Sequence, residues 1–152
     1  MRSAGKFLRY WLPVLVWMSL MLSASTNAGA PRYTSRILNP LLQWLFPAMP
    51  AETRVVITIG IRKAAHLTEY AVLALLVWRA LRHRKDSPAA GWNGRVAFAA
   101  VAFAAAFAST DEFFQTFWSE RSGSPKDVAL DTFGAALGMG LLWLAGRWRG
   151  KW

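Results

Sequence analysis

The chain has 152 residues, of which 55% are hydrophobic and only 17% are charged, and it contains nine tryptophans. This is the length of one domain, and the composition is too apolar for an ordinary soluble domain of that size, so it indicates an integral membrane protein. The sequence has no cysteine, which excludes disulfides, thiolate metal sites and cysteine nucleophiles. The net charge of +10 does not indicate nucleic-acid binding, because no recognition motif accompanies it and the basic residues cluster at the ends of apolar runs.

The first apolar run covers residues 7–25 and follows the basic residues Arg2, Lys6 and Arg9. Its length suits a membrane-spanning helix, which needs about 20 apolar residues. A basic start, an apolar stretch and the small-residue sequence NAGA at 27–30 are also typical of a cleaved signal peptide. The residues of this run leave both interpretations open.

A connector with four prolines follows over residues 27–62, and it contains a short apolar stretch at 36–46. This stretch is too short to span a membrane, so we predict an interfacial or re-entrant helix in the first outer loop. Three longer apolar runs predict spanning helices over 64–81, 96–118 and 128–146. The predicted fold is therefore an all-α, integral membrane four-helix bundle that forms a single domain over residues 1–152.

The basic residues predict how the bundle is oriented. Eleven of the 18 Lys and Arg residues fall on the side that holds both termini and the loop at 82–95. The positive-inside rule makes this side cytoplasmic, so we expect a multi-pass protein with both termini in the cytoplasm. Seven of the eight acidic residues lie outside the membrane or near the outer end of a helix. The polar chemistry of the chain is therefore expected on the outer side.

Ionisable residues of three helices are predicted to lie at one height. His66, Asp111 and Asp131 each lie 16 residues from a basic residue at the inner end of their helix, which corresponds to about 24 Å of helix rise. Ionisable residues at such a depth face a bundle interior or a water-filled cavity. Spacings of three or four residues place further polar side chains on the same helix faces: Glu69 and Tyr70 with His66, Gln115 with Glu112, and Asp127 with Asp131.

Three segments carry a family resemblance: KAAHLTEYAVLALL from Lys63, DEFFQTFWSER from Asp111, and SPKDVALDTFGAALG from Ser124. Together they resemble the signature of the VanZ-like family of small bacterial membrane proteins. The resemblance implies four membrane helices with a retained first helix, a place in the bacterial cytoplasmic membrane, and a link to the cell envelope or to glycopeptide resistance. It implies no settled reaction. The chain departs from the family pattern at Ser119 and Glu120, where Pro-Gly is usual, and at Asp131, where Asn is usual.

The principal functional prediction is an outward-facing polar pocket that binds or acts on an amphiphilic cell-envelope substrate, such as a lipid or a lipid-linked molecule. His66, oriented by Glu69, is the candidate general base or acid, and Asp111 and Glu112 are candidates for a second proton-transfer group. Arg121 and Lys63 are candidates to hold a phosphate or carboxylate, because guanidinium groups bind oxyanions in a bidentate manner. The remaining candidate substrate-binding residues are Tyr70, Gln115, Asp127 and Asp131.

Several alternatives stay open. His66 with Glu69, Asp111 and Glu112 has the donor types of a divalent cation site, although no cofactor is predicted. The polar cluster also has a structural interpretation, in which its hydrogen bonds fix helix packing. A non-enzymatic accessory or scaffold protein is a further alternative, because Gly134 and Gly138 suit association with another membrane protein as well as packing within one chain. Catalysis and the oligomeric state stay undetermined by the sequence.

Overall fold

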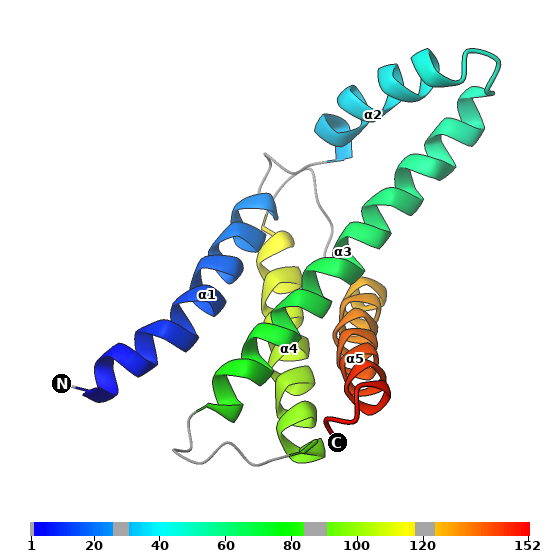
Figure 1. The fold of residues 1–152 in the computed structure, drawn as a ribbon. Coiled ribbons are helices and arrows are strands. Elements are labelled where there is room, and N and C mark those ends of the chain that lie inside the picture. The colour runs from blue at the N-terminus through cyan, green and yellow to red at the C-terminus, as the bar shows by residue number, and fades with distance from the viewer. Residues whose placement is uncertain (1, 26–30, 84–90, 118–123) are drawn as a thin grey trace.

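The computed structural model describes residues 2–25, 31–83, 91–117 and 124–152, and within these ranges it contains five α-helices and no strand. In chain order the helices are α1 (Arg2–Ala24), α2 (Pro31–Leu45), α3 (Ala51–Arg82), α4 (Gly94–Gln115) and α5 (Pro125–Trp148), as Figure 1 shows. By length and composition, α1, α3, α4 and α5 can each cross a membrane. The prediction of an all-α membrane bundle with four spanning helices is therefore confirmed.

The bundle has a core of three helices, α3, α4 and α5, and α1 packs along its side mainly against α3. The most extensive contact joins α3 and α5. It depends on two glycines: a Cβ atom at Gly134 would lie 2.6 Å from the Leu67 carbonyl oxygen, and one at Gly138 would lie 2.8 Å from the Ala71 Cβ. Both glycines are thus used for packing inside the chain, which decides between the two interpretations that the sequence left open.

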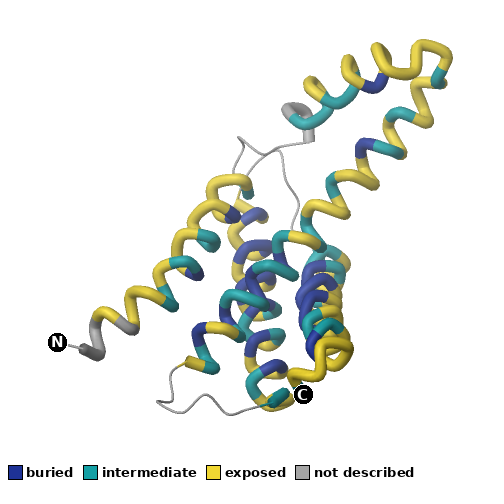
Figure 2. The backbone as a smooth tube through the Cα atoms, viewed as in Figure 1, coloured by how far each residue is buried: buried dark blue, intermediate teal, exposed yellow. Residues whose placement is uncertain are grey.

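Buried residues line the inner faces of the bundle and exposed residues form its outside (Figure 2), and many of the buried residues are small while many of the exposed ones are large and apolar. On α4 the buried face is built from Ala97, Ala100, Ala104 and Ala108, which recur every three or four residues. Large side chains such as Phe98, which is 74% exposed, point away from the bundle. This pattern is typical of membrane helices, which associate by close packing of small residues because lipid is as apolar as the larger side chains.

Helix α3 is much longer than the sequence predicted. It begins at Ala51 instead of residue 64, and its 32 residues rise about 48 Å, against about 30 Å for a hydrocarbon core. Pro50 is the last proline of the predicted connector and directly precedes α3, so nothing after it breaks the helix. Helix α2 likewise begins at Pro31 and not at residue 36. It packs against α3. We call α2 together with residues 51–62 of α3 the hairpin, and this part of the chain extends beyond the bundle (Figure 1).

The remaining boundaries differ from the predicted ones by a few residues. Helix α1 covers Arg2–Ala24 where 7–25 was predicted. Helix α4 begins two residues early, after Asn93 caps it by accepting from the backbone N–H groups of Arg95 and Val96, and it ends at Gln115 instead of residue 118. Helix α5 starts three residues before 128, where Ser124 caps it and Pro125 occupies its first position, and it ends two residues after 146.

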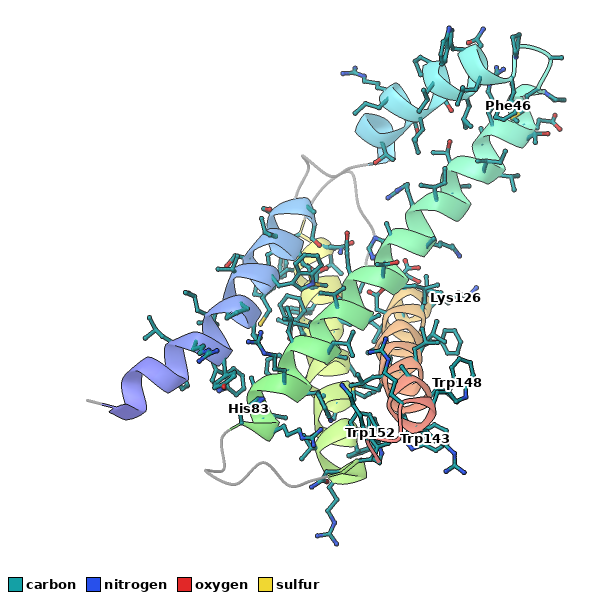
Figure 3. The ribbon with its side chains drawn as sticks, in the orientation of Figure 1. Phe46, His83, Lys126, Trp143, Trp148 and Trp152 are labelled. Atoms are coloured by element: carbon teal, nitrogen blue, oxygen red, sulfur yellow. The ribbon has the colours of Figure 1, made fainter. Side chains whose placement is uncertain are left out.

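The opposite ends of the bundle differ in chemistry. The end that carries Arg82, Arg95 and Arg147 is here called the basic end. There the C-terminal Trp152 folds back on α5, and its indole N–H donates to the Trp143 carbonyl over 3.0 Å (Figure 3). Arg82 lies over the ring of Trp152 at 5.7 Å. Such cation–π contacts tie the chain end to α3 and keep the charge of the arginine at the surface.

Candidate functional site

The buried faces of α3, α4 and α5 all end in polar residues at the end of the bundle opposite the basic end. These five residues, here called the polar layer, are Tyr70, Asp111, Glu112, Gln115 and Asp131. None of them is more than 6% exposed. The Tyr70 hydroxyl lies within electrostatic range of four carboxylates, those of Asp131, Asp111, Glu112 and Glu69. Three helices therefore gather negative charge around one buried phenol.

Helical periodicity explains why the polar layer is buried. On α4, Asp111, Glu112 and Gln115 continue the three-and-four spacing of the buried alanines that end at Ala108. On α5, Asp131 lies one turn before Gly134, which fits tightly against α3. The same faces that pack the helices together thus carry these carboxylates into the interior.

Asp111 connects α4 to the end of α1. Its Oδ2 accepts a hydrogen bond of 2.7 Å from the Ser25 hydroxyl and one of 3.1 Å from the Gln115 amide. About two turns earlier on α1, the Trp17 indole N–H donates to the Glu69 backbone carbonyl over 3.0 Å. Helix α1 therefore takes part in the site through two hydrogen bonds.

Glu112 connects α4 to the start of α5. Its Oε2 accepts a hydrogen bond of 2.8 Å from the backbone N–H of Ser124, the residue that caps α5. The carboxylate also lies within electrostatic range of Asp127, Asp131 and Asp111. An anion beside the first turn of a helix is favoured by the helix dipole and by the unpaired N–H groups of that turn. Glu112 thereby holds the two ends of the α4–α5 connection together.

His66 joins the polar layer to the surface of the bundle. Its Nδ1 lies 3.4 Å from the Asp131 Oδ1, and the exposed fractions of the two side chains are 29% and 1%. No well-aligned hydrogen bond reaches the Asp131 Oδ1 or the Tyr70 hydroxyl from any described residue, and both atoms are buried. Buried polar atoms without partners are rare in proteins and often mark a functional site. The interior beside His66 therefore has unused capacity to bind a polar group.

A cavity of about 200 Å³ also borders His66. Its lining residues come from the end of α1, Ser25 directly after it, the first turns of α2 and the middle of α3. Its polar lining consists of Ser25, Thr34, Arg62, His66 and Glu69. His66 thus borders a partly open cavity and also contacts the buried carboxylate of Asp131.

The residues singled out in the sequence fall into distinct places. His66 and Glu69 line the cavity, and Tyr70, Asp111, Glu112, Gln115 and Asp131 form the polar layer. Asp127 is half-buried in the first turn of α5, whereas Lys63 is exposed and does not line the cavity. Arg121, Ser119 and Glu120 lie outside the described residues. No three of the His, Asp and Glu side chains in the described part of the chain form a group suited to a metal ion.

Three polar residues of the cavity lining were not predicted from the sequence: Ser25, Thr34 and Arg62. A signal for Arg62 exists, because it precedes His66 by four residues and Glu69 by seven and so shares their helix face. The signal is hidden, because the prolines before it indicate a connector instead of a helix. Ser25 and Thr34 reach the cavity only through contacts between helices, which local spacing does not reveal.

Comparison with known proteins gives one match. A family model described as VanZ/LLP1 matches residues 10–146, which include most of α1 and the whole of α2, α3 and α4. The matched range contains the polar layer and all eight residues that line the cavity. No curated protein and no solved structure matches the chain.

Proposed function

The chain belongs to the VanZ/LLP1 family, and from this premise we propose that the cavity and the polar layer form one site that binds or acts on an amphiphilic cell-envelope substrate. One observation carries the proposal: His66 both lines a partly open cavity and lies 3.4 Å from the buried carboxylate of Asp131. A titratable side chain in such a position can exchange protons or hydrogen bonds with a ligand while a buried carboxylate lies beside its Nδ1.

The chemistry of His66 and Asp131 follows from which of their atoms face each other: the Nδ1 of His66 lies opposite the Oδ1 of Asp131. A carboxylate opposite Nδ1 favours the imidazole tautomer that carries its proton on Nδ1, and this tautomer has its lone pair on Nε2. An imidazole held in this way suits a general base, and once protonated it suits a general acid. Asp131 therefore acts as a positioning residue for His66, and Asp111 and Glu112 supply further proton-transfer groups behind it.

The energetics of the polar layer favour a functional use over a purely structural one. An ionised side chain deep in a bilayer costs about 2.5–3.5 kcal/mol on insertion scales. Hydrogen bonds between membrane helices contribute on average about 0.6 kcal/mol each in measured cases. Hydrogen bonds of that size do not offset the burial of three carboxylates, so packing alone is a poor explanation for their presence.

The location of the site suits an amphiphile. Most basic residues gather near the basic end, and the positive-inside rule then directs the polar layer and the cavity to the outer side of the cytoplasmic membrane. Ile61 lines the cavity and is 44% exposed, and Leu22 near the end of α1 is 40% exposed. A polar headgroup in the cavity can therefore keep its apolar chain in the surrounding lipid.

The accessory or scaffold alternative has less support in the structure. Its sequence evidence was the pair Gly134 and Gly138, and both glycines contact α3 of the same chain. The contacts that α1 makes through Trp17 and Ser25 fit a retained first helix, because a helix that contributes to the site is needed in the mature protein.

The proposal is tested by single substitutions in cells that depend on the protein for glycopeptide tolerance. We expect His66→Ala and Asp111→Ala to abolish the tolerance while the amount of protein in the membrane stays normal. His83→Ala is the matched control, because this exposed histidine stacks on Tyr10 at the basic end, far from the cavity. Full tolerance in both site variants at normal membrane levels would overturn the proposal.

A further inference from the structure

Arg62 is the basic residue that lines the cavity together with His66. Its side chain is half-buried, and no hydrogen bond or ion pair ties its guanidinium to another described residue. Arg54, on the same helix, differs in this respect, because it donates to the Met49 carbonyl over 2.9 Å. A guanidinium carries five N–H donors in a planar fork and no acceptor. Arg62 therefore offers several unused donors to whatever occupies the cavity.

We propose that Arg62 binds the oxyanion of an anionic headgroup, a phosphate or a carboxylate, in this cavity. The inference rests on the proposed function and names the class of its ligand. Planar donors in a fork fit phosphate and carboxylate groups in a bidentate manner, which a lysine ammonium does not. The Thr34 hydroxyl, on the α2 wall of the cavity, supplies one further donor. A site with these donors selects an anion over a zwitterion or a neutral sugar.

The charges of the site set the position of the anion along α3. Arg62 precedes His66 by four residues, which is about 6 Å of helix rise, and Glu69 by seven, which is about 10 Å. Negative charge therefore increases from the Arg62 end of the cavity toward Glu69 and the polar layer. An anionic group is attracted to the Arg62 end and repelled from the carboxylates. The part of the ligand next to its oxyanion is then held beside His66.

This assignment adds a residue to the pair that the sequence suggested for anion binding. Lys63 is adjacent in sequence but exposed and outside the cavity lining, and Arg121 lies outside the described residues. Lys63 consequently provides a matched control for Arg62, because neutralising either residue removes one positive charge from the same turn of α3. Only Arg62 lines the cavity, so only its loss removes donors from the ligand.

The test uses the full-length protein in nanodiscs of phosphatidylcholine, with binding measured by calorimetry. The probes are a short-chain phosphatidic acid, a phosphatidylcholine of the same chain length, and inorganic phosphate. We expect the phosphatidic acid to bind, with affinity reduced about ten-fold or more in Arg62→Gln and less than about three-fold in Lys63→Gln, because a hydrogen bond to a charged group is lost only in the first variant. Arg62→Lys keeps the charge without the fork and is expected to fall between them.

The possible outcomes distinguish a lipid headgroup from a free anion, and they test the Arg62 assignment separately from the proposed function. Binding of phosphatidic acid but not of inorganic phosphate identifies a lipid headgroup, whereas equal Arg62-dependent binding of both identifies the free anion. Unchanged binding in Arg62→Gln, or equal losses in Arg62→Gln and Lys63→Gln, would overturn the assignment to Arg62 while leaving the effect of His66→Ala on tolerance intact. Arg62-dependent binding combined with full tolerance in both His66→Ala and Asp111→Ala would instead overturn the proposed function alone.

Discussion

Replacing Gly134 by alanine tests the contact that brings α5 against α3. The new Cβ atom would lie 2.6 Å from the Leu67 carbonyl oxygen and 2.8 Å from the Leu67 Cα, both of them backbone atoms that cannot rotate away. Close C–H···O contacts between helices have carbon–oxygen distances of about 3.3–3.6 Å, so α5 must move outward by about 0.7 Å or more. Overpacking of this kind costs about 1–3 kcal/mol, and we expect a loss of about 2 kcal/mol in the free energy of unfolding.

Gly140→Ala is the matched control, because it makes the same change on the same helix where a Cβ atom would meet nothing within 4 Å. Thermal unfolding of both purified variants in detergent, followed by tryptophan fluorescence, measures the difference. We expect a lower Tm for Gly134→Ala and no decrease for Gly140→Ala, since alanine favours the helix relative to glycine. Equal Tm values for the two variants would refute the tight α3–α5 contact, and with it the geometry that places Asp131 beside His66.

Two further predictions concern the hydrogen bonds of the polar layer. Glu112→Ala leaves the Ser124 N–H without its acceptor and is expected to lower the free energy of unfolding by about 1–3 kcal/mol. Glu112→Gln keeps an acceptor oxygen, so its free energy of unfolding is expected to fall by less. Equal losses for the two variants in thermal unfolding would contradict the role of this bond. Ser25→Ala removes a donor to Asp111 and is expected to lower the free energy of unfolding by about 1 kcal/mol. Ser19→Ala is the control, because the Ser19 hydroxyl bonds within α1, and its free energy of unfolding is expected to stay nearly the same. Indistinguishable Tm values for the two variants would show that the bond from Ser25 does not stabilise the site.

The polar layer could be predicted from the sequence because two regularities of membrane helices together give the depth of a residue. The rise per residue is constant, and basic residues mark one face of the membrane, so counting from Arg82, Arg95 and Arg147 gives the depth of a polar residue on each helix. Asp111 and Asp131 then come to the same end of the bundle, and the three-and-four spacing places them on its inner faces. The contact of His66 with Asp131 agrees with this common height.

The cavity could not be predicted in the same way. Its walls come from α1, α2 and α3, and their contacts depend on how the hairpin folds back toward the end of α1. The prolines between residues 31 and 50 indicated a connector, so the sequence did not predict that α3 begins at Ala51 and includes Arg62. Spacing within one helix suggested Glu69 as the residue that orients His66, whereas the structure adds Asp131, a partner from another helix that no local pattern reveals.

The central claim is that the cavity beside His66 receives the headgroup of an amphiphile. The most direct measurement is a high-resolution structure of the full-length protein extracted with its native lipids. The account predicts an anionic headgroup in the cavity, in contact with Arg62 and His66, with its apolar chain running toward the exposed faces of α1 and α3. Native lipid headgroups bound only at the basic end, with the cavity filled by protein side chains, would contradict it.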